Sequence, residues 1–362
     1  MATSRLLRPA NNCLRRLHHR PYSSASPSTP QTSPFAPRHL LSIADLTPAE
    51  LTKLVLNASA HKQAIKSGSG TPFSLRDALQ GKTIAMPFTK RSTRTRVSTE
   101  AAVALMNGHP MFLGSQDIQL GVNESLYDTS VVISSMVSAI VARVNAHEDV
   151  AGLAKHSSVP VINALSDAFH PLQTIADYLT MHEAFPSTQT SSNHSSLGLE
   201  GLKIAWVGDA NNVLYDLAIG AAKLGVQMAV ATPKGYEIPA SFRETITSSS
   251  SSTMLSETNV PEEAVKNADI IVTDTWVSMG QEEEKARRMR DFAGFQVTAE
   301  LAKRGGAKEG WKFMHCLPRH PEEVSDEVFH APNSLVFQEA ENRLWAAVAT
   351  LEGFVVNQGK IV

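Results

Sequence analysis

Basic and hydroxyl side chains gather in one short stretch between an apolar run and an alanine-rich segment. Residues 83–88 (Thr-Ile-Ala-Met-Pro-Phe) are typical of a buried strand, residues 97–106 have helical character, and Lys-Arg-Ser-Thr-Arg-Thr-Arg stands between them at 90–96. A helix N-terminus offers free N–H groups and the positive end of the dipole, and an arginine can hold a phosphate through two hydrogen bonds. The stretch therefore predicts an anion site, with a solvated basic helix start as the alternative. It lacks the pattern G-x-x-x-x-G-K-[ST], so no nucleotide P-loop is expected.

Other polar residues also follow predicted strands, where ligands collect in parallel α/β domains. They are Arg143, the pair His170 and Gln173, the pair Asn211 and Asn212, Asp274, and Cys316. A helix cap is the alternative for His170 and Asp274, a surface residue for Arg143, and a nucleophile or a metal ligand for Cys316. The turn before the two asparagines lacks G-x-G-x-x-G, which argues against a dinucleotide. Adjacent amides suit an amino-acid carboxylate instead, and a carboxylate such as Asp274 could pair with an α-ammonium group.

Four motifs resemble those of the aspartate/ornithine carbamoyltransferase family, and the resemblance covers the chain from about residue 38 to the end. Ser92-Thr93-Arg94-Thr95 is similar to the S-x-R-T carbamoyl-phosphate motif, and residues 170–173 are similar to H-P-x-Q. Residues 274–280 resemble D-x-W-x-S-M-G, which the aspartate branch lacks. Residues 315–320 match H-C-L-P-R-H, where the aspartate branch carries no cysteine. The resemblance is therefore to the ornithine branch.

The resemblance implies a role for each matching residue. The implied catalytic residues are Arg94, His170, Asp274 and Cys316. The implied carbamoyl-phosphate ligands are Ser92, Thr93, Arg94, Thr95, Gln119, Arg143, His170, Gln173, Cys316, Leu317 and Arg343. The implied ornithine ligands are Asn212, Asp274, Ser278 and Met279. Within these sets, His170 and Gln173 would polarise the carbonyl oxygen, and Asp274 with Cys316 would surround the attacking side-chain amine.

The implied reaction transfers a carbamoyl group from carbamoyl phosphate to L-ornithine, giving L-citrulline and phosphate in arginine biosynthesis. No cofactor is required. A covalent route through Cys316 is not expected because phosphate is already a good leaving group, and adjacent His and Cys lack zinc-site spacing, so no metal is expected. We predict that carbamoyl phosphate binds first and that ornithine induces domain closure. Two alternatives stay open: carbamoylation of putrescine or an acetylated ornithine, and a regulatory binding protein that docks on arginase.

The predicted elements alternate between strands and helices, which indicates an α/β fold with two parallel-sheet domains joined by interdomain helices. The second domain is expected to be Rossmann-like. Strands are predicted at 83–88, 110–113, 139–144, 160–163, 203–207, 227–231, 270–273 and 312–315. The Ser/Thr-rich stretches 186–197 and 246–256 are predicted to be loops. We divide the chain into a transit peptide (1–36), a carbamoyl-phosphate-binding domain (37–183), an ornithine-binding domain (184–337) and a C-terminal helix that returns to the first domain (338–362).

The first residues differ from the rest of the chain in composition. They are rich in Arg and Ser, and no Asp or Glu precedes Asp45, as in a mitochondrial transit peptide for the matrix; an ordinary disordered tail is the alternative. The net charge of −2 gives no case for a nucleic-acid partner, and no apolar run predicts a membrane span. Of the two cysteines, Cys13 would leave with the transit peptide. The family resemblance implies a trimer with shared sites, in which the loop with Gln119 can reach a neighbouring subunit.

Overall fold

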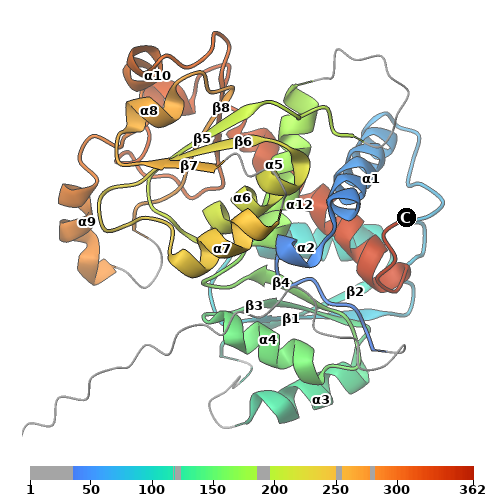
Figure 1. Ribbon diagram of the computed structural model, residues 1–362. Coiled ribbons are helices and arrows are strands. Elements are labelled where there is room, and N and C mark those ends of the chain that lie inside the picture. Colours follow the sequence, from blue (N-terminus) through green and yellow to red (C-terminus); the bar gives the residue numbers. More distant parts are fainter. Residues whose placement is uncertain (1–35, 117, 119–123, 186–195, 250–254, 278–281) are drawn as a thin grey trace, which may run out of the picture.

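Two parallel β-sheets form the framework of the protein, which we describe from a computed structural model (Figure 1). The structure describes residues 36–116, 118, 124–185, 196–249, 255–277 and 282–362. The fold is therefore the α/β arrangement with two parallel sheets that the sequence predicts. Among these residues, no helix is long and apolar enough to cross a membrane.

The first sheet has the strand order β2-β1-β3-β4. Its strands are β1 (Thr83–Phe88), β2 (His109–Gly114), β3 (Ala139–Arg143) and β4 (Val161–Leu165). The helices of this half are α1 (Pro48–Lys66), α2 (Arg94–Leu105), α3 (Leu126–Met136), α4 (His147–His156) and α5 (Pro171–Ala184). β1 and β3 are buried along almost their whole length, as expected for central strands covered on both faces. Arg94 and Arg143 thus stand at the carboxyl ends of, or just beyond, two neighbouring strands.

The second sheet has the strand order β7-β6-β5-β8-β9. Its strands are β5 (Lys203–Val207), β6 (Gln227–Ala231), β7 (Leu255–Thr258), β8 (Ile270–Thr273) and β9 (Lys312–His315). Its helices are α6 (Asn212–Leu224), α7 (Ala240–Ser248), α8 (Pro261–Val265), α9 (Lys285–Asp291), α10 (Ala299–Gly305) and α11 (Asp326–Phe329). From β5 the chain adds β6 and β7 on one side and then crosses to add β8 and β9 on the other side. The strand order therefore reverses between β5 and β8, and the crevice between their carboxyl ends is the expected ligand position.

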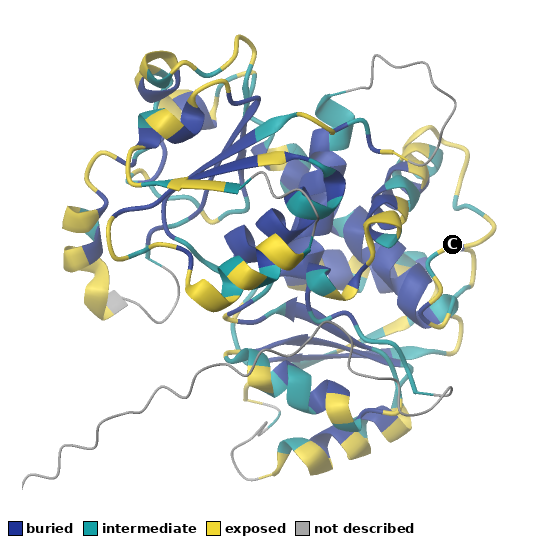
Figure 2. Cartoon of the chain, in the orientation of Figure 1, coloured by how far each residue is buried: buried dark blue, intermediate teal, exposed yellow. Residues whose placement is uncertain are grey.

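Helices α5 and α12 (Val336–Leu351) lie between the two sheets (Figure 1). α12 packs against α1, α2 and α5, and a π-helical turn, Glu352–Val356, follows it. One apolar cluster runs from Ile84 in β1 through Tyr178 and Trp345 to Trp206 in β5. Figure 2 shows that buried residues concentrate in the sheets and in the helices between them. The two halves therefore share a core, which fixes the carboxyl ends of both sheets around one space.

The prediction of a loop at 246–256 is wrong at both ends. α7 continues to Ser248, and β7 begins at Leu255 as an edge strand parallel to β6. β7 has no buried residue, so it carries no apolar alternation from which the sequence could reveal it. A 3₁₀ turn, Glu282–Glu284, precedes α9. These differences lie away from the carboxyl ends of the central strands.

Candidate functional site

A cavity of about 760 Å³ lies between the carboxyl ends of the two sheets. Both halves of the chain line it. The first half contributes Lys90 to Thr95, Arg143, Leu165 to Asp167, His170 and Gln173. The second contributes Asp209 to Val213, Tyr215, Asp274, Thr275, Val277, Lys285, Arg288, Cys316 to Pro318, His320, Glu322 and Arg343. The described residues that the sequence assigned to the site are therefore brought together.

Three arginines converge on one end of this cavity. Arg94 is the first residue of α2, Arg143 is the last of β3, and Arg343 comes from α12. None forms an ion pair with a carboxylate within the described part of the chain. Burial lowers the pKa of Arg143 and of Arg343 to about 10, and repulsion by Arg94 adds to the lowering in both cases. Arg143 and Arg343 therefore stay charged at neutral pH, and this group of guanidinium side chains is complementary to an anion.

The start of α2 adds hydrogen-bond donors to the arginines. Thr93 occupies the N-cap position and makes no capping bond with any described residue, and the Thr95 N–H donates to Ser92 Oγ at 3.2 Å. Thr95 is buried, and its hydroxyl accepts from Arg343 Nη2 at 3.1 Å. Arg94 donates to the carbonyl oxygen of Leu317, which ties the helix start to the segment after β9. These donors surround the position at which the sequence predicts an anion, and the anion site stays a prediction.

His170 is a neutral imidazole at the start of α5. Burial lowers its pKa well below 6.5, and the charges of Arg343, Arg143 and Arg94 lower it further. Its backbone N–H donates to Asp216 Oδ2 at 2.8 Å, and its Nδ1 atom is buried without a partner among the described residues. Its Nε2 atom lies 3.4 Å from Arg343 Nη1, and a guanidinium can only donate, so Nε2 is the acceptor and Nδ1 carries the N–H that remains for a ligand.

Gln173 is held by three neighbours, and with Asp177, Glu339 and Arg343 it forms what we call the carboxamide clamp. Its Nε2 donates to Asp177 Oδ1 at 2.8 Å and to Glu339 Oε1 at 3.0 Å. Its Oε1 accepts from Arg343 Nη1 at 2.6 Å. Both amide hydrogens are thus used. The resemblance implied that Gln173 donates to the carbonyl oxygen of the substrate, and in this arrangement it cannot. Its oxygen keeps one lone pair and can accept from an N–H group.

Asp177 and Glu339 were not singled out from the sequence. Burial raises the pKa of Asp177 to about 7, and burial and the Asp177 charge raise that of Glu339 well above 4.5. Asp177 stands four residues after Gln173 and Glu339 four residues before Arg343, so each shares a helix face with a predicted site residue. That spacing is the signal that could have identified them.

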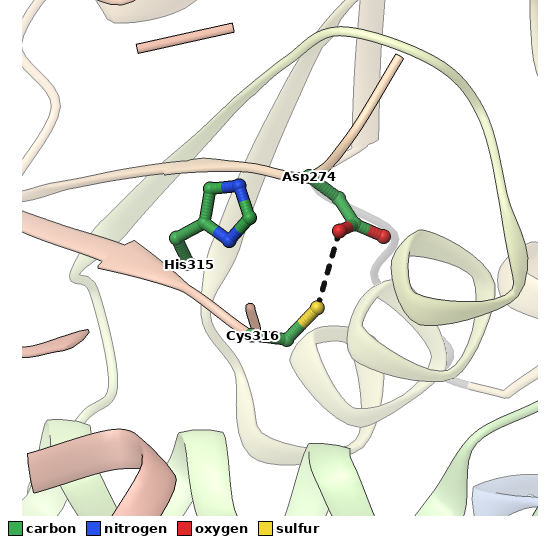
Figure 3. Close-up of side chains that lie close together, drawn as sticks. All are labelled: Asp274, His315 and Cys316. Carbon is green, nitrogen blue, oxygen red and sulfur yellow. Dashed lines mark hydrogen bonds between the residues drawn. The ribbon is translucent and has the colours of Figure 1, made fainter. Parts of the chain in front are cut away.

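The other end of the cavity carries an acid, a thiol and two amides. Cys316 Sγ donates to Asp274 Oδ1 at 3.2 Å (Figure 3). Burial and the nearby Asp274 raise the pKa of Cys316 well above 9, so it is a thiol at neutral pH. Asn211 Nδ2 donates to Asp274 Oδ2 at 2.8 Å, and its oxygen caps α6. Asn212 Nδ2 donates to the Ser166 carbonyl oxygen at 2.6 Å. Asn211 therefore orients Asp274, and Asn212 lines the cavity.

Asp274, His315 and Cys316 lie close enough to be considered as a metal site, and Figure 3 shows them together. Both His315 ring nitrogens have other partners: Nδ1 accepts from the Leu317 N–H at 2.9 Å, and Nε2 lies 3.3 Å from Glu323 Oε1. His315 therefore holds the backbone before Leu317. The expectation of a site without a metal stays a prediction.

A buried ion pair lies beside the Asp274 segment and was also missed from the sequence. Arg288 Nη1 donates to Asp209 Oδ2 at 2.8 Å and to the Trp276 carbonyl oxygen at 3.0 Å. The two side chains are 8% and 9% exposed. The pair spans α9 and the end of β5, so no local pattern indicates it. It fixes the backbone just after Asp274.

Several predicted residues cannot be compared with the structure. Gln119, Ser278 and Met279 lie outside the described residues, and so does almost all of the predicted transit peptide, residues 1–36.

The chain matches two known family domains. The aspartate/ornithine carbamoyltransferase carbamoyl-P binding domain matches residues 38–183, and the Asp/Orn binding domain of the same family matches residues 200–353.

Full-length relatives are similar over almost the whole chain. The mitochondrial ornithine carbamoyltransferase of Emericella nidulans is 71% identical over 349 residues, covering 95% of this chain and 96% of the relative. That of Coccidioides immitis is 68% identical over 348 residues, covering 94% and 98%.

Solved structures show the same fold. The crystal structure of the mitochondrial ornithine carbamoyltransferase from C. immitis superposes with a TM-score of 0.83 at 67% identity, covering 90% of this chain and 100% of that chain. The ornithine carbamoyltransferase of Pyrococcus furiosus gives 0.81 at 43% identity, covering 89% and 98%.

Proposed function

This chain belongs to the aspartate/ornithine carbamoyltransferase family, and from this we infer that it transfers the carbamoyl group of carbamoyl phosphate to the side-chain amine of L-ornithine. The products are L-citrulline and phosphate, a step of arginine biosynthesis. The observation that carries the inference is the convergence of Arg94, Arg143 and Arg343, unpaired with acids among described residues, in one cavity with Asp274 and Cys316.

We propose that the phosphate group binds to Arg94, Arg143 and the start of α2 at residues 92–95. Guanidinium groups hold phosphate oxygens through paired, charge-assisted hydrogen bonds, and the helix dipole favours the same charge. Low solvent exposure strengthens these contacts, since Arg143 is 7% exposed. The Nε atom of Arg143 has no partner among the described residues, and a phosphate oxygen would satisfy this donor.

The carbamoyl group would lie between donors for its oxygen and acceptors for its amino group. Thr95, His170 and Arg343 stand on the donor side, and the Gln173 and Leu317 oxygens are the acceptors. As the amine attacks, negative charge develops on the carbonyl oxygen. Preorganised donors at that position lower the barrier, and removing one costs about 100- to 1000-fold in rate.

Ornithine would bind at the Asp274 end, through Asn212, Asp274, Ser278 and Met279. Its side-chain amine resembles that of lysine, whose pKa is about 10.4, so it must lose a proton before it attacks. Cys316 is a thiol that already donates to Asp274, so it is not the base. We propose that the ammonium group releases its first proton to water and that Asp274 orients the neutral amine. As the C–N bond forms and the C–O bond to phosphate breaks, the departing phosphate takes the second proton that the nitrogen releases.

The assignment of domains, compartment and partners follows the same proposal. Residues 37–183 would bind carbamoyl phosphate, residues 184–337 would bind ornithine, and residues 338–362 would complete the first domain. The relatives are named mitochondrial, and we propose the mitochondrial matrix, with residues 1–36 as the targeting segment. Fluorescence of this segment fused to a reporter, combined with protease protection in isolated mitochondria, would test the compartment.

A homotrimer with shared sites is the proposed assembly. α3 leaves four large apolar side chains exposed: Tyr127 at 56%, Val131 at 41%, Val132 at 46% and Met136 at 70%. Exposed apolar groups on one helix are a feature of interaction surfaces. Light scattering after size-exclusion chromatography should give the mass of three chains, and a monomer would contradict the proposal. A contact with arginase is a further proposal, to be tested by pull-down of purified arginase.

The experiment that tests the function is an assay of carbamoyl transfer from carbamoyl phosphate by the full chain. Ornithine, putrescine, N-acetylornithine and aspartate are compared as acceptors. We expect turnover with ornithine alone. Turnover with another amine instead would retain the anion site but refute the ornithine assignment. No turnover by folded protein would refute the function as a whole.

A further inference from the structure

The carboxamide clamp holds the amide group of Gln173 between three other buried side chains, and the four residues come from two helices. Gln173 and Asp177 are on α5, and Glu339 and Arg343 are on α12; each is at most 3% exposed. The spacing of four residues on each helix brings both members of a pair to the same face. The clamp is thus set by the packing of α5 against α12, the two helices between the sheets.

The clamp admits one orientation of the Gln173 amide. The observed one directs two N–H bonds at carboxyl oxygens, 2.8 and 3.0 Å away, and the amide oxygen at a guanidinium, 2.6 Å away. The flipped amide would set its oxygen against two carboxyl groups and its hydrogens against the donors of Arg343. Three unfavourable contacts would replace three favourable ones, so the oxygen is fixed on the side of the cavity.

Glu339 also connects the amide to the second acceptor of the site. Its Oε2 accepts from the His315 N–H at 2.9 Å, and His315 Nδ1 in turn accepts from the Leu317 N–H at 2.9 Å. One carboxyl group therefore holds both Gln173 and the backbone that presents the Leu317 oxygen. These two oxygens are the acceptors assigned above to the amino group of the substrate.

We propose that Glu339, together with Asp177, is a positioning residue that makes the site select the amino group of carbamoyl phosphate over the methyl group of an acyl phosphate. This inference rests on the proposed function, because it assumes that carbamoyl phosphate is the anion bound. It adds a specificity role to two residues that do not touch the substrate.

Packing alone cannot make this selection, because an amino group and a methyl group are close in size. Two fixed acceptor oxygens can. Each already accepts one hydrogen bond, from Arg343 and from Arg94 respectively, and a methyl group offers no donor for the remaining lone pair. Each hydrogen bond lost in this way weakens binding by about 2- to 10-fold. The selection depends on the acceptors being fixed: if Gln173 could rotate, the site would adapt to either group.

Replacing Glu339 by glutamine tests the positioning directly. A carboxyl oxygen accepts a hydrogen bond whether or not the group carries a proton, whereas an amide nitrogen accepts none. Glu339→Gln has one accepting oxygen for the two donors, Gln173 Nε2 and the His315 N–H. Either the amide of Gln173 or the segment at Leu317 is therefore released, while the volume of the side chain is preserved.

The control is Glu183→Gln, which makes the same chemical change in the same pair of helices. The Glu183 carboxylate accepts from Lys62 at 2.8 Å, Gln338 at 2.8 Å and Asn342 at 3.0 Å. It does not line the cavity. Loss of packing between α5 and α12 would affect both variants, whereas loss of amide positioning affects only Glu339→Gln.

Calorimetric titration in the cold gives dissociation constants of the full chain for carbamoyl phosphate, acetyl phosphate and inorganic phosphate. In the wild-type protein we expect acetyl phosphate to bind about 10-fold more weakly than carbamoyl phosphate. Glu339→Gln should reduce that ratio by about 2- to 10-fold with little change for inorganic phosphate, and Glu183→Gln should retain it. If circular dichroism shows that Glu339→Gln is unfolded, Glu339→Asp replaces it, because the shorter acid cannot reach both donors.

A wild-type ratio near one would overturn the proposal. So would a ratio that the Glu339 variant leaves unchanged, or three dissociation constants that rise together, since both indicate a packing role only. The binding assay is independent of turnover. Absence of citrulline formation would refute the proposed function, and an unchanged ratio in an active enzyme would refute only the positioning role.

Discussion

Replacing Arg288 by glutamine removes the cation that neutralises buried Asp209. Arg288 also donates to the Trp276 carbonyl oxygen at 3.0 Å, two residues after Asp274. Breaking a buried ion pair by removing one partner costs about 3–5 kcal/mol, because the remaining charge is left without compensation. The glutamine amide can keep the bond to Trp276, worth about 1 kcal/mol. We therefore expect the free energy of unfolding to fall by about 3 kcal/mol, towards the lower end of that range.

The pH dependence follows from the carboxyl group. Burial raises the pKa of Asp209 to about 6, although Arg288 lowers it. A carboxyl group with a raised folded-state pKa contributes stability that is fully present below its unfolded pKa and is lost as the pH rises through the folded value. Without Arg288 the pKa of Asp209 in the folded state rises further. The variant therefore continues to lose stability as the pH rises above 6, whereas the wild-type protein does not. The difference between the two proteins should be larger at pH 8 than at pH 5.

Urea unfolding at pH 5 and pH 8 measures both effects. The matched control is Arg287→Gln, one position away, because Arg287 is 67% exposed in its pair with Asp291. An exposed pair is worth about 0–1 kcal/mol, so that variant should resemble the wild-type protein at both pH values. In the double variant Asp209→Asn/Arg288→Gln, part of the loss at pH 8 should be recovered. Equal losses at the two pH values, or a loss no larger than that of Arg287→Gln, would refute the reasoning.

Three further predictions concern the cavity and the core. Iodoacetamide at pH 7.5 should label Cys316 far more slowly than free cysteine, because burial and Asp274 raise its pKa and thiolate is the reactive form; labelling at the free rate, read by peptide mass spectrometry, would contradict this. Arg143→Gln should lower kcat/KM for carbamoyl phosphate by about 100-fold or more, and a loss below tenfold would exclude a phosphate contact. Gly220→Ala should lower the free energy of unfolding by about 1–3 kcal/mol, because its Cβ would lie 2.4 Å from Cε2 of the fully buried Tyr178; thermal unfolding at or above the wild-type midpoint would contradict this.

Apart from Arg343, the described site residues that the sequence identified share one kind of position. They follow a strand or begin a helix at the carboxyl edge of a parallel sheet. Arg94, His170 and Asp274 could be placed from the order of elements alone, because parallel strands bring their ends to one edge. Arg343 required the family resemblance, since an arginine within a helix carries no positional signal.

The residues that were missed act through partners distant in sequence. Arg288 and Asp209 meet across 79 positions. Glu339 and Gln173 meet across 166. Each is a polar residue of a helix or loop, and such residues are usually exposed, so only the tertiary structure reveals that they are buried. The expected donor role of Gln173 failed for the same reason, because the orientation of an amide depends on neighbours that its motif does not contain.

Glu339 and Arg343 lie in α12, so the site cannot be complete until this helix has been synthesised. Arg94 and Arg143 are translated early, and both sheets are complete by His315. The nascent chain nevertheless lacks Arg343 and the clamp until α12 has left the ribosome. The contacts assigned to the carbamoyl group therefore stabilise only the finished chain, whereas the phosphate ligands Arg94 and Arg143 are present much earlier. A premature stop just before α12 would keep every strand in the sequence and still remove Arg343 and Glu339 from the site.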